Sequence, residues 1–203
     1  MTHTQVGPIK DTKIGTVEKP HAYYDGVYTE GVDLVHMQPI YESIVALLKG
    51  FRSIKPQVLE IGCGTGILGK MIMDAGFRYR GFDFSAVAIR KCPHEIRAFV
   101  TRRNAYHTAP YRVGHNVVVA VEVMEHLRDL EVVERISSGS YCIFTLPNFT
   151  DEAHLRVYPD SKEIKRYYKG LIKWSRITPV KMCEDDGVDG GYKIIHVCKG
   201  VKI

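Results

Sequence analysis

A short apolar run that breaks into three closely spaced glycines constrains the fold more than any other part of the chain. Residues 58–61 lead directly into Gly62, Gly64 and Gly66, and apolar residues then recur at helical spacing over 67–72. This pattern predicts a strand, a tight turn and the start of a helix. Glycine lets the backbone approach a ligand closely, and the N–H groups at a helix start bind polar or anionic groups. We therefore expect a nucleoside-bearing cofactor at this turn.

The rest of the chain alternates between patterns typical of strands and of helices. We expect strands over 57–62, 78–84, 98–101, 116–123, 140–146, 174–182 and 192–198, and helices over 39–49, 66–75, 85–92, 124–136 and 161–168. The unbroken apolar run at 117–121 is typical of a parallel strand covered on both faces. Ser85 and Ser161 are expected as N-caps. The alternation predicts an α/β fold, with a mostly parallel sheet, helices on both faces and a final antiparallel strand pair.

The first 36 residues differ in composition from the rest, and we expect an arm over 1–36 followed by one domain over 37–203. Residues 1–19 are polar and show no periodicity, which is typical of a loosely held terminus. The next segment, residues 21–31, contains Tyr23, Tyr24 and Tyr28 together with two glycines. The arm is either a lid over an active site or a surface segment whose rings pack on the domain, and the sequence leaves both open.

Composition excludes several classes of protein. No apolar run reaches the length of a membrane span, and the N-terminus lacks the pattern of a signal peptide. Five scattered cysteines without a Cys-x-x-Cys pair favour reduced thiols in a cytoplasmic protein. The formal net charge of +5 is mild, so it permits an anionic partner without requiring one.

Three cofactor classes use glycine-rich turns of this kind. A phosphate-binding loop requires Lys-Ser or Lys-Thr after its last glycine, whereas Gly66 is followed by Ile67 and Leu68. A dinucleotide site requires Gly-x-Gly-x-x-Gly, and the run from Gly64 to Gly69 matches that spacing formally. The phosphate-loop reading therefore fails, and the dinucleotide reading stays open.

The third class is indicated by a resemblance. Five segments in order resemble the motifs of the class I S-adenosylmethionine-dependent methyltransferases: 60–66, Asp83, Asn104 with Ala105, 117–127 and 145–149. The run Glu122-Val123-Met124-Glu125-His126-Leu127 is similar to the fourth-strand motif of the ubiquinone-biosynthesis O-methyltransferase type. The resemblance implies a Rossmann-like seven-stranded sheet of order 3-2-1-4-5-7-6, in which one strand is antiparallel.

The resemblance also implies which residues hold S-adenosylmethionine. They are Glu60, Gly62, Cys63, Gly64, Gly66, Asp83, Phe84, Asn104, Ala105, Glu122 and Val123. In this family an acidic residue in the position of Asp83 accepts hydrogen bonds from the ribose hydroxyls. Asn104 stands where the family often has aspartate beside the adenine. All these positions lie at carboxyl ends of strands, where open α/β sheets bind ligands.

Residues for the methyl acceptor are sought in the loop after the fifth strand and in the arm. His154 is a candidate base for an acceptor hydroxyl, and Arg156 a candidate partner for an anionic group on the acceptor. Tyr28 is a candidate substrate-binding residue, and His126 a second candidate base. For each of them the alternative is a local packing or hydrogen-bonding role.

A metal site also has to be considered. Glu122, Glu125 and His126, together with His154, are similar to the two-glutamate, two-histidine ligand set of the small-RNA 3′-end methyltransferases. Carboxylate and imidazole groups suit a divalent ion. The same Glu-x-x-Glu-His run is common in small-molecule methyltransferases of this fold without that role, so we expect no metal site.

The function expected from these observations is methyl transfer by direct displacement to an oxygen, rather than a nitrogen, of a small-molecule acceptor, which can be anionic. Three alternatives remain: an RNA or protein methyltransferase using the basic residues, a non-catalytic cofactor-binding scaffold, and a dinucleotide-dependent oxidoreductase. We expect no nucleic-acid partner and no membrane partner. The sequence leaves the oligomeric state open.

Overall fold

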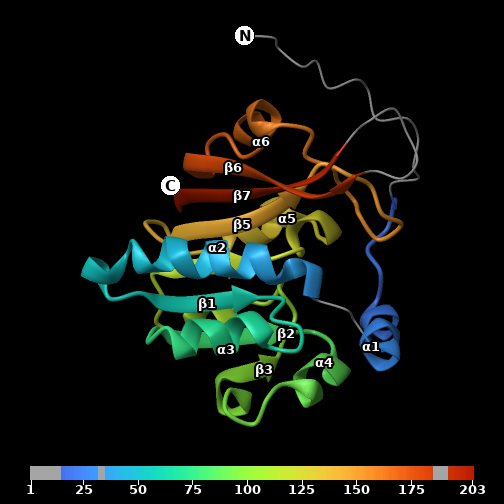
Figure 1. The fold of residues 1–203 in the computed structure, drawn as a ribbon, viewed down its shortest axis with the longest axis vertical. Helices are drawn as coiled ribbons and strands as arrows, with labels where there is room; N and C mark the ends of the chain where they lie inside the picture. Colours follow the sequence, from blue (N-terminus) through green and yellow to red (C-terminus); the bar gives the residue numbers. More distant parts are fainter. Residues whose placement is uncertain (1–14, 32–34, 185–191) are drawn as a thin grey trace.

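A twisted sheet of seven strands, in the order β3-β2-β1-β4-β5-β7-β6, forms the centre of the molecule (Figure 1). The computed structural model describes residues 15–31, 35–184 and 192–203. The strands are β1 (Gln57–Ile61), β2 (Arg78–Asp83), β3 (Val100–Arg102), β4 (Val117–Ala120), β5 (Tyr141–Pro147), β6 (Ile172–Glu184) and β7 (Tyr192–Lys202). The predicted strand order is confirmed. The predicted turn-rich segment between the last two strands lies mostly outside the described residues.

The pairing of the strands explains why ligand-binding loops gather at one edge. The first five strands pair in parallel, and β7 pairs antiparallel with both β5 and β6. Parallel strands joined by crossovers bring all their carboxyl ends to the same edge. All four residues of β4 are inaccessible to solvent, as its unbroken apolar run predicts.

Helices cover both faces of the sheet. They are α1 (His21–Glu30), α2 (Gln38–Lys49), α3 (Ile67–Asp74), α4 (Ala86–Lys91), α5 (Asp129–Glu134) and α6 (Ser161–Tyr167), with short 3-10 helices η1 (Val35–Met37), η2 (Arg52–Ile54), η3 (Arg97–Phe99), η4 (Ala109–Arg112) and η5 (Met124–His126). One core contains residues of α2 and α3, among them Ile44, Leu48, Leu68 and Ile72. The other contains residues of α5 and α6, among them Val132, Val133 and Ile164. No helix among these residues is long and apolar enough to cross a membrane.

Two local predictions were wrong. The helix expected over 124–136 is divided into η5 and α5, because the N–H of Arg128 donates to Tyr106 Oη at 2.8 Å and to Glu18 Oε1 at 2.9 Å instead of continuing a helix. The N-cap of α6 is Asp160, not Ser161, since Asp160 Oδ1 accepts hydrogen bonds from Lys162 N at 2.7 Å and Glu163 N at 2.9 Å. The Ser85 N-cap is confirmed, with its Oγ accepting from Ala88 N at 3.1 Å.

The described part of the N-terminal arm contains α1, which lies beside the carboxyl edge of the sheet (Figure 1). Asp25 Oδ1 accepts hydrogen bonds from Ser85 Oγ at 2.6 Å and from Val87 N at 3.1 Å, so α1 is fastened to the start of α4. Further upstream, Gly15 N donates to His154 O at 2.8 Å. Part of the predicted boundary between arm and domain lies outside the described residues, and that division stays a prediction.

Candidate active site

A cavity of about 640 Å³ opens at the carboxyl edge of the sheet, beneath α1. Of the residues predicted to hold a cofactor, ten line it: Glu60, Gly62, Cys63, Gly64, Asp83, Phe84, Asn104, Ala105, Glu122 and Val123. Gly66 does not line the cavity, because it forms the N-cap of α3 behind the turn. The fold therefore collects residues from β1, β2, the loop after β3 and the end of β4 around one space.

The glycine turn has a backbone that other residues rarely adopt. The φ angles of Gly62, Gly64 and Gly66 are 66°, 53° and 78°. A Cβ atom on Gly62 would come within 2.4 Å of Val123 Cγ2, and one on Gly64 within 2.8 Å of Tyr28 Oη. The turn thus needs glycine for its dihedral angles and for close approach of neighbouring groups. Gly62 and Gly64 also line the cavity, so the turn brings backbone atoms to its wall.

Asp83 lies at the end of β2 with its carboxylate beside the turn. Its Oδ2 accepts from Gly64 N at 3.0 Å and its Oδ1 from Ser85 N at 2.8 Å. Burial raises the pKa of this carboxyl group, and the bonds from backbone N–H groups oppose that rise. Each carboxylate oxygen offers more than one lone pair, so Asp83 can also accept hydrogen bonds from a pair of ligand hydroxyls.

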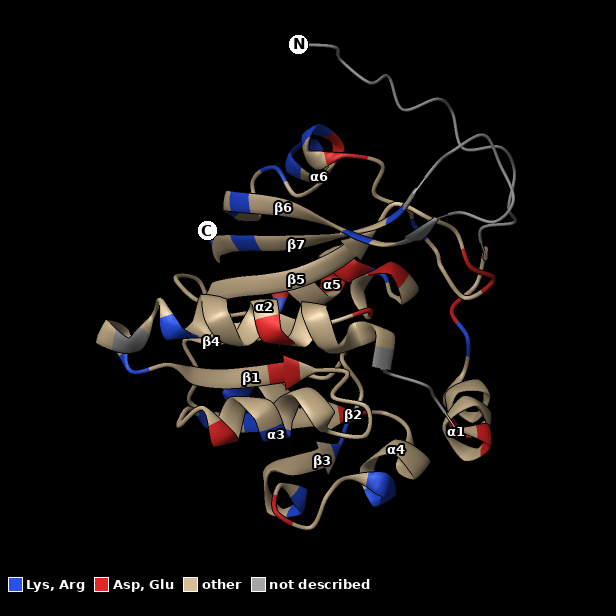
Figure 2. Cartoon of the chain, in the orientation of Figure 1, with Lys and Arg blue, Asp and Glu red and all other residues tan. Residues whose placement is uncertain are grey.

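Glu60 gives β1 an acidic carboxyl end, which is visible in Figure 2. Its Oε2 accepts from Tyr79 Oη at 2.5 Å, and burial raises the pKa of Glu60 to about 8. Across the turn, Glu122 follows β4 with a positive φ of 51°. Glu122 Oε1 accepts from Thr145 Oγ1 at 2.8 Å, and burial raises the pKa of Glu122 to about 7.

The loop after β3 shows what asparagine does at position 104. Asn104 Oδ1 accepts from Tyr106 N at 2.8 Å. The side chain therefore shapes its own loop, and the loop brings Asn104 and Ala105 to the cavity wall. Aspartate could accept the same backbone hydrogen bond, so the substitution is compatible with the loop conformation.

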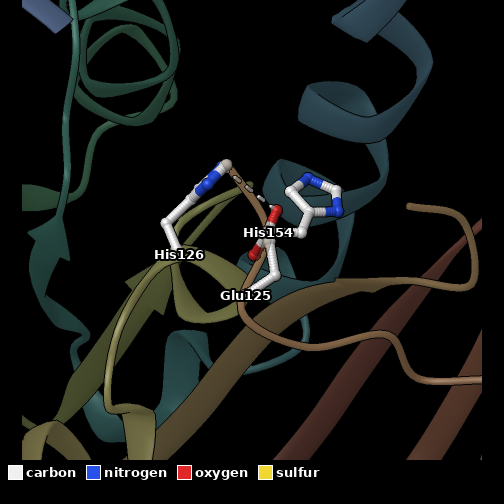
Figure 3. A group of neighbouring side chains, drawn as sticks. All are labelled: Glu125, His126 and His154. Atoms are coloured by element: carbon white, nitrogen blue, oxygen red, sulfur yellow. Dashed lines mark ion pairs between the residues drawn. The ribbon is translucent and has the colours of Figure 1, made fainter. Parts of the chain in front are cut away.

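Both predicted histidines reach the cavity, from two different loops. His126 ends η5, and His154 lies in the loop after β5, with 4.9 Å between their ring centroids (Figure 3). Burial lowers the pKa of His126 to about 4 and also lowers that of His154. Both rings are therefore neutral near neutral pH, and a neutral imidazole has a lone pair that can accept a proton.

Tyr28 and Arg156, the other predicted acceptor residues, are placed differently. Tyr28 lies on the cavity wall facing Gly64. Arg156 is not part of the wall, and its guanidinium lies 3.9 Å from the centroid of the Tyr167 ring. The N–H of Leu155, the residue before Arg156, bonds to Glu125 O at 2.7 Å. A role of Arg156 in acceptor binding stays a prediction.

Several cavity residues were missed by the sequence analysis. They come from η1, α2, the loop after β5 and the last two strands: Met37, Tyr41, Phe149, Met182, Lys193 and Ile195. Phe149 ends the motif segment 145–149, although it was not predicted to line the cavity, and no motif marks the other five positions, which reach the cavity only through the folding of distant segments. The contact of Asp25 with the start of α4 was also missed, because no helix was predicted over the segment that contains Asp25.

Comparisons with known proteins agree with this geometry. Residues 34–166 match a family model described as a methyltransferase domain. No curated protein sequence is detectably similar to the chain.

Several solved structures share the fold at low identity. The PH0226 protein of Pyrococcus horikoshii OT3 is 15% identical, with a TM-score of 0.64 over 89% of this chain and 99% of that one. The magnesium protoporphyrin IX methyltransferase of Synechocystis PCC 6803, solved with bound SAH, is 14% identical, with a TM-score of 0.61 over 89% and 94%. A SAM-dependent methyltransferase of Archaeoglobus fulgidus is 19% identical, with a TM-score of 0.53 over 79% and 94%.

Proposed function

The chain belongs to the methyltransferase-domain family, with S-adenosylmethionine as its cofactor, and from this premise we propose that it methylates an oxygen of a small-molecule acceptor. The observation that carries the proposal is one continuous cavity, lined by the glycine turn and Asp83 as well as by the two neutral histidines. A methyl donor held on the turn and an acceptor beside the histidines would therefore share one space.

The cofactor end of the cavity fits its ligand in two respects. Gly62 and Gly64 bring backbone atoms to the cavity wall, and Asp83 has lone pairs left for ribose hydroxyls after accepting two backbone hydrogen bonds. When bound, S-adenosylmethionine supplies a methyl group on a positively charged sulfur, and the acceptor oxygen displaces that sulfur in one step. The protein then has to align the acceptor and exclude water.

The apolar part of the cavity wall supports a small acceptor with an apolar body. This part includes Met37, Tyr41, Phe149 and Ile195, whose side chains can contact apolar groups of a ligand. Lys193 adds one positive charge, with its Nζ 5.7 Å from the centroid of the Phe149 ring. A small aromatic or isoprenoid hydroxy compound with an anionic group would match this combination of surfaces.

The base in this proposal is His154, with His126 as the second candidate. Each imidazole has its Nδ1 within hydrogen-bonding distance of a backbone carbonyl, and a carbonyl oxygen can only accept a hydrogen bond. Nδ1 therefore carries the hydrogen, and the lone pair of Nε2 is free to take the proton of the acceptor hydroxyl as the new bond forms. A neutral amine is nucleophilic enough to attack before it loses a proton, whereas a hydroxyl group is a weak nucleophile until it does, so a positioned base favours oxygen.

The resemblance to the ubiquinone-biosynthesis O-methyltransferases is part of the same proposal. A cytoplasmic location also belongs to it, supported by four free buried cysteines among the described residues: Cys63, Cys92, Cys142 and Cys198. The alternative of an RNA methyltransferase receives less support, since α6 is short and one of its basic residues, Arg166, pairs with Glu163 of the same helix (Figure 2). Interspersed charges are typical of a solvated surface.

Binding and turnover together test the proposal. Calorimetry should detect S-adenosylhomocysteine binding and no NAD binding. Labelled S-adenosylmethionine, incubated with a panel of phenols, hydroxy acids and amines, should methylate members with a hydroxyl group, and added RNA should not compete. Binding of NAD alone would refute the cofactor, while label found only in amines or in RNA would refute the acceptor class.

A further inference from the structure

Three potential ligand atoms from two separate parts of the chain converge at the cavity wall, which includes two of the three residues. Glu125, His126 and His154 each contribute one such atom, and these atoms lie within 4.8 Å of one another (Figure 3). Glu125 and His126 belong to η5, while His154 belongs to the loop after β5. The hydrogen bond from Leu155 N to Glu125 O, at 2.7 Å, holds that loop against η5.

Both imidazoles are oriented with their Nε2 lone pairs free. His126 Nδ1 lies 3.0 Å from Ala153 O, and His154 Nδ1 lies 3.1 Å from Phe149 O. Because each carbonyl must accept, each Nδ1 must donate, and this fixes the same tautomer in both rings. In metal sites, histidine ligands almost always donate their second nitrogen to a carbonyl or carboxylate in this way.

The unpaired carboxylate of Glu125 is a second, independent sign of a ligand at this cluster. The residue is completely buried, and neither carboxylate oxygen has a hydrogen-bond partner among the described residues. The nearest group of opposite potential charge is His126, whose Nε2 lies 3.8 Å from Glu125 Oε1. A buried carboxylate without partners is costly, and here it faces nitrogen lone pairs that offer it no hydrogen. The arrangement needs a positive charge between these atoms.

We propose that Glu125, His126 and His154 form a binding site for one divalent first-row transition-metal ion. Two neutral imidazoles and a carboxylate are a donor set that such ions prefer, with the remaining coordination positions left open. Metal–ligand bonds of about 2.0–2.2 Å separate neighbouring ligand atoms by roughly 3–4 Å. The three side chains would therefore move together by about 1 Å when the ion binds.

The neighbouring carboxylate is not part of this site. Glu122 Oε1 accepts from Thr145 Oγ1, so its carboxylate is held toward β5. The inference thus differs from the sequence-based expectation of no metal, and it also differs from a four-residue site that includes Glu122. The fold selects three of the four residues by orienting their side chains.

A proton on Glu125 is the competing explanation. Burial, assisted by the nearby charge of Glu122, raises the pKa of Glu125 well above its usual range. One proton would neutralise the carboxylate, but at a separation of 3.8 Å it would make no hydrogen bond to His126 Nε2. Protonation of Glu125 would also not explain why the imidazole of His154 lies next to Glu125 and His126. The two explanations differ in whether the three residues bind a metal ion.

The role of the ion rests on the proposed function. His126 and His154 line the cavity, so open coordination positions would face the acceptor end. A divalent ion lowers the pKa of an oxygen ligand. An acceptor hydroxyl bound to it would release its proton to solvent, and the histidines would then act as ligands instead of as the base.

Metal binding can be measured without cofactor or acceptor. The chain, stripped with a chelator and free of any affinity tag, would be titrated with Co²⁺ while its visible absorption and heat are recorded. We expect one ion per chain, and a loss of affinity of at least ~10-fold in Glu125→Gln and in His154→Gln. His107→Gln is the matched control, because this histidine is exposed and lies outside the cluster.

The variants must be folded for the comparison to count, which circular dichroism and S-adenosylhomocysteine binding both report. If Glu125→Gln does not fold, His154→Gln and the wild-type titration suffice. Absence of saturable Co²⁺ binding to the wild type, or binding that neither variant weakens, would overturn the site and favour a protonated Glu125. Since this assay contains no acceptor, failure of the proposed methyl transfer would leave its result unaffected.

Discussion

Replacing Gly64 with alanine tests whether the cofactor lies against the glycine turn. Gly64 has a φ of 53°, and its N–H donates to Asp83 Oδ2. A Cβ atom at this position would lie 2.8 Å from Tyr28 Oη, closer than carbon and oxygen atoms normally approach. The added methyl group would therefore occupy space between the turn and α1, at the wall of the cavity.

The effect of Gly64→Ala has two parts, backbone strain and steric crowding, and the same change at Gly76 measures the backbone strain alone. A left-handed backbone costs alanine about 1–2 kcal/mol of stability, and this cost applies equally at Gly76, where φ is 84°. A Cβ on Gly76 would meet no atom within 4 Å. Crowding at Gly64 adds about 1–3 kcal/mol. If that crowding opposes cofactor binding, it corresponds to roughly a 5- to 150-fold loss of affinity.

Calorimetry with S-adenosylhomocysteine and urea denaturation would measure the two effects on the same samples. Gly64→Ala and Gly76→Ala should lose similar stability through backbone strain, whereas only Gly64→Ala should bind the ligand more weakly. If Gly64→Ala binds S-adenosylhomocysteine as tightly as the wild type, the cofactor does not lie on this turn and our reasoning is wrong. Equal losses of affinity in both variants would point to general destabilisation instead.

Three further predictions concern charged side chains around the cavity. Asp83→Asn should weaken S-adenosylhomocysteine binding by about 10- to 100-fold in calorimetry, because charge-assisted hydrogen bonds contribute about 1.5–3 kcal/mol; unchanged affinity would contradict its role. Asp25→Ala should lower stability by about 1 kcal/mol and speed hydrogen exchange in α1, whereas Glu30→Ala, an exposed change on the same helix, should do neither. Burial raises the pKa of Glu60 to about 8 in the folded chain, above its value in the unfolded chain. The folded state therefore holds the Glu60 proton more tightly than the unfolded state does. The stability gained in this way is present at low pH and is lost as the pH rises through about 8. Relative to Glu60→Gln, the wild type should lose on the order of 4 kcal/mol between about pH 5 and about pH 9 in urea denaturation; a constant difference would contradict the raised pKa.

The two histidines can take part in catalysis in two exclusive ways. In the proposed function, with the metal site empty, a free Nε2 would accept the proton of the acceptor. With an ion bound, the same lone pairs are occupied. Chelator treatment therefore separates the two cases: activity that survives it would identify a histidine base, and activity that Co²⁺ restores would identify an ion-bound acceptor.

The sequence by itself determined the alternation of strands and helices and the position of the glycine turn, whereas the strand order was expected from the resemblance to the class I methyltransferases. Strand and helix periodicity act over a few neighbouring residues, so the alternation and the buried strand β4 were readable directly. The glycine turn is also local, because its left-handed angles exclude most other residues. Asp83 and Glu122 could be placed near this turn in advance, because they lie at the carboxyl ends of parallel strands and these ends meet at one edge of the sheet.

Only the tertiary structure decided the acceptor end. Arg128 leaves the expected helix because Glu18 and Tyr106, both distant in sequence, take its N–H. The convergence of Glu125, His126 and His154 depends on backbone carbonyls in the loop after β5, which fix both imidazole tautomers. Such contacts join segments whose separation along the chain carries no periodic signal. They exist only once the packing of the sheet has placed those segments together.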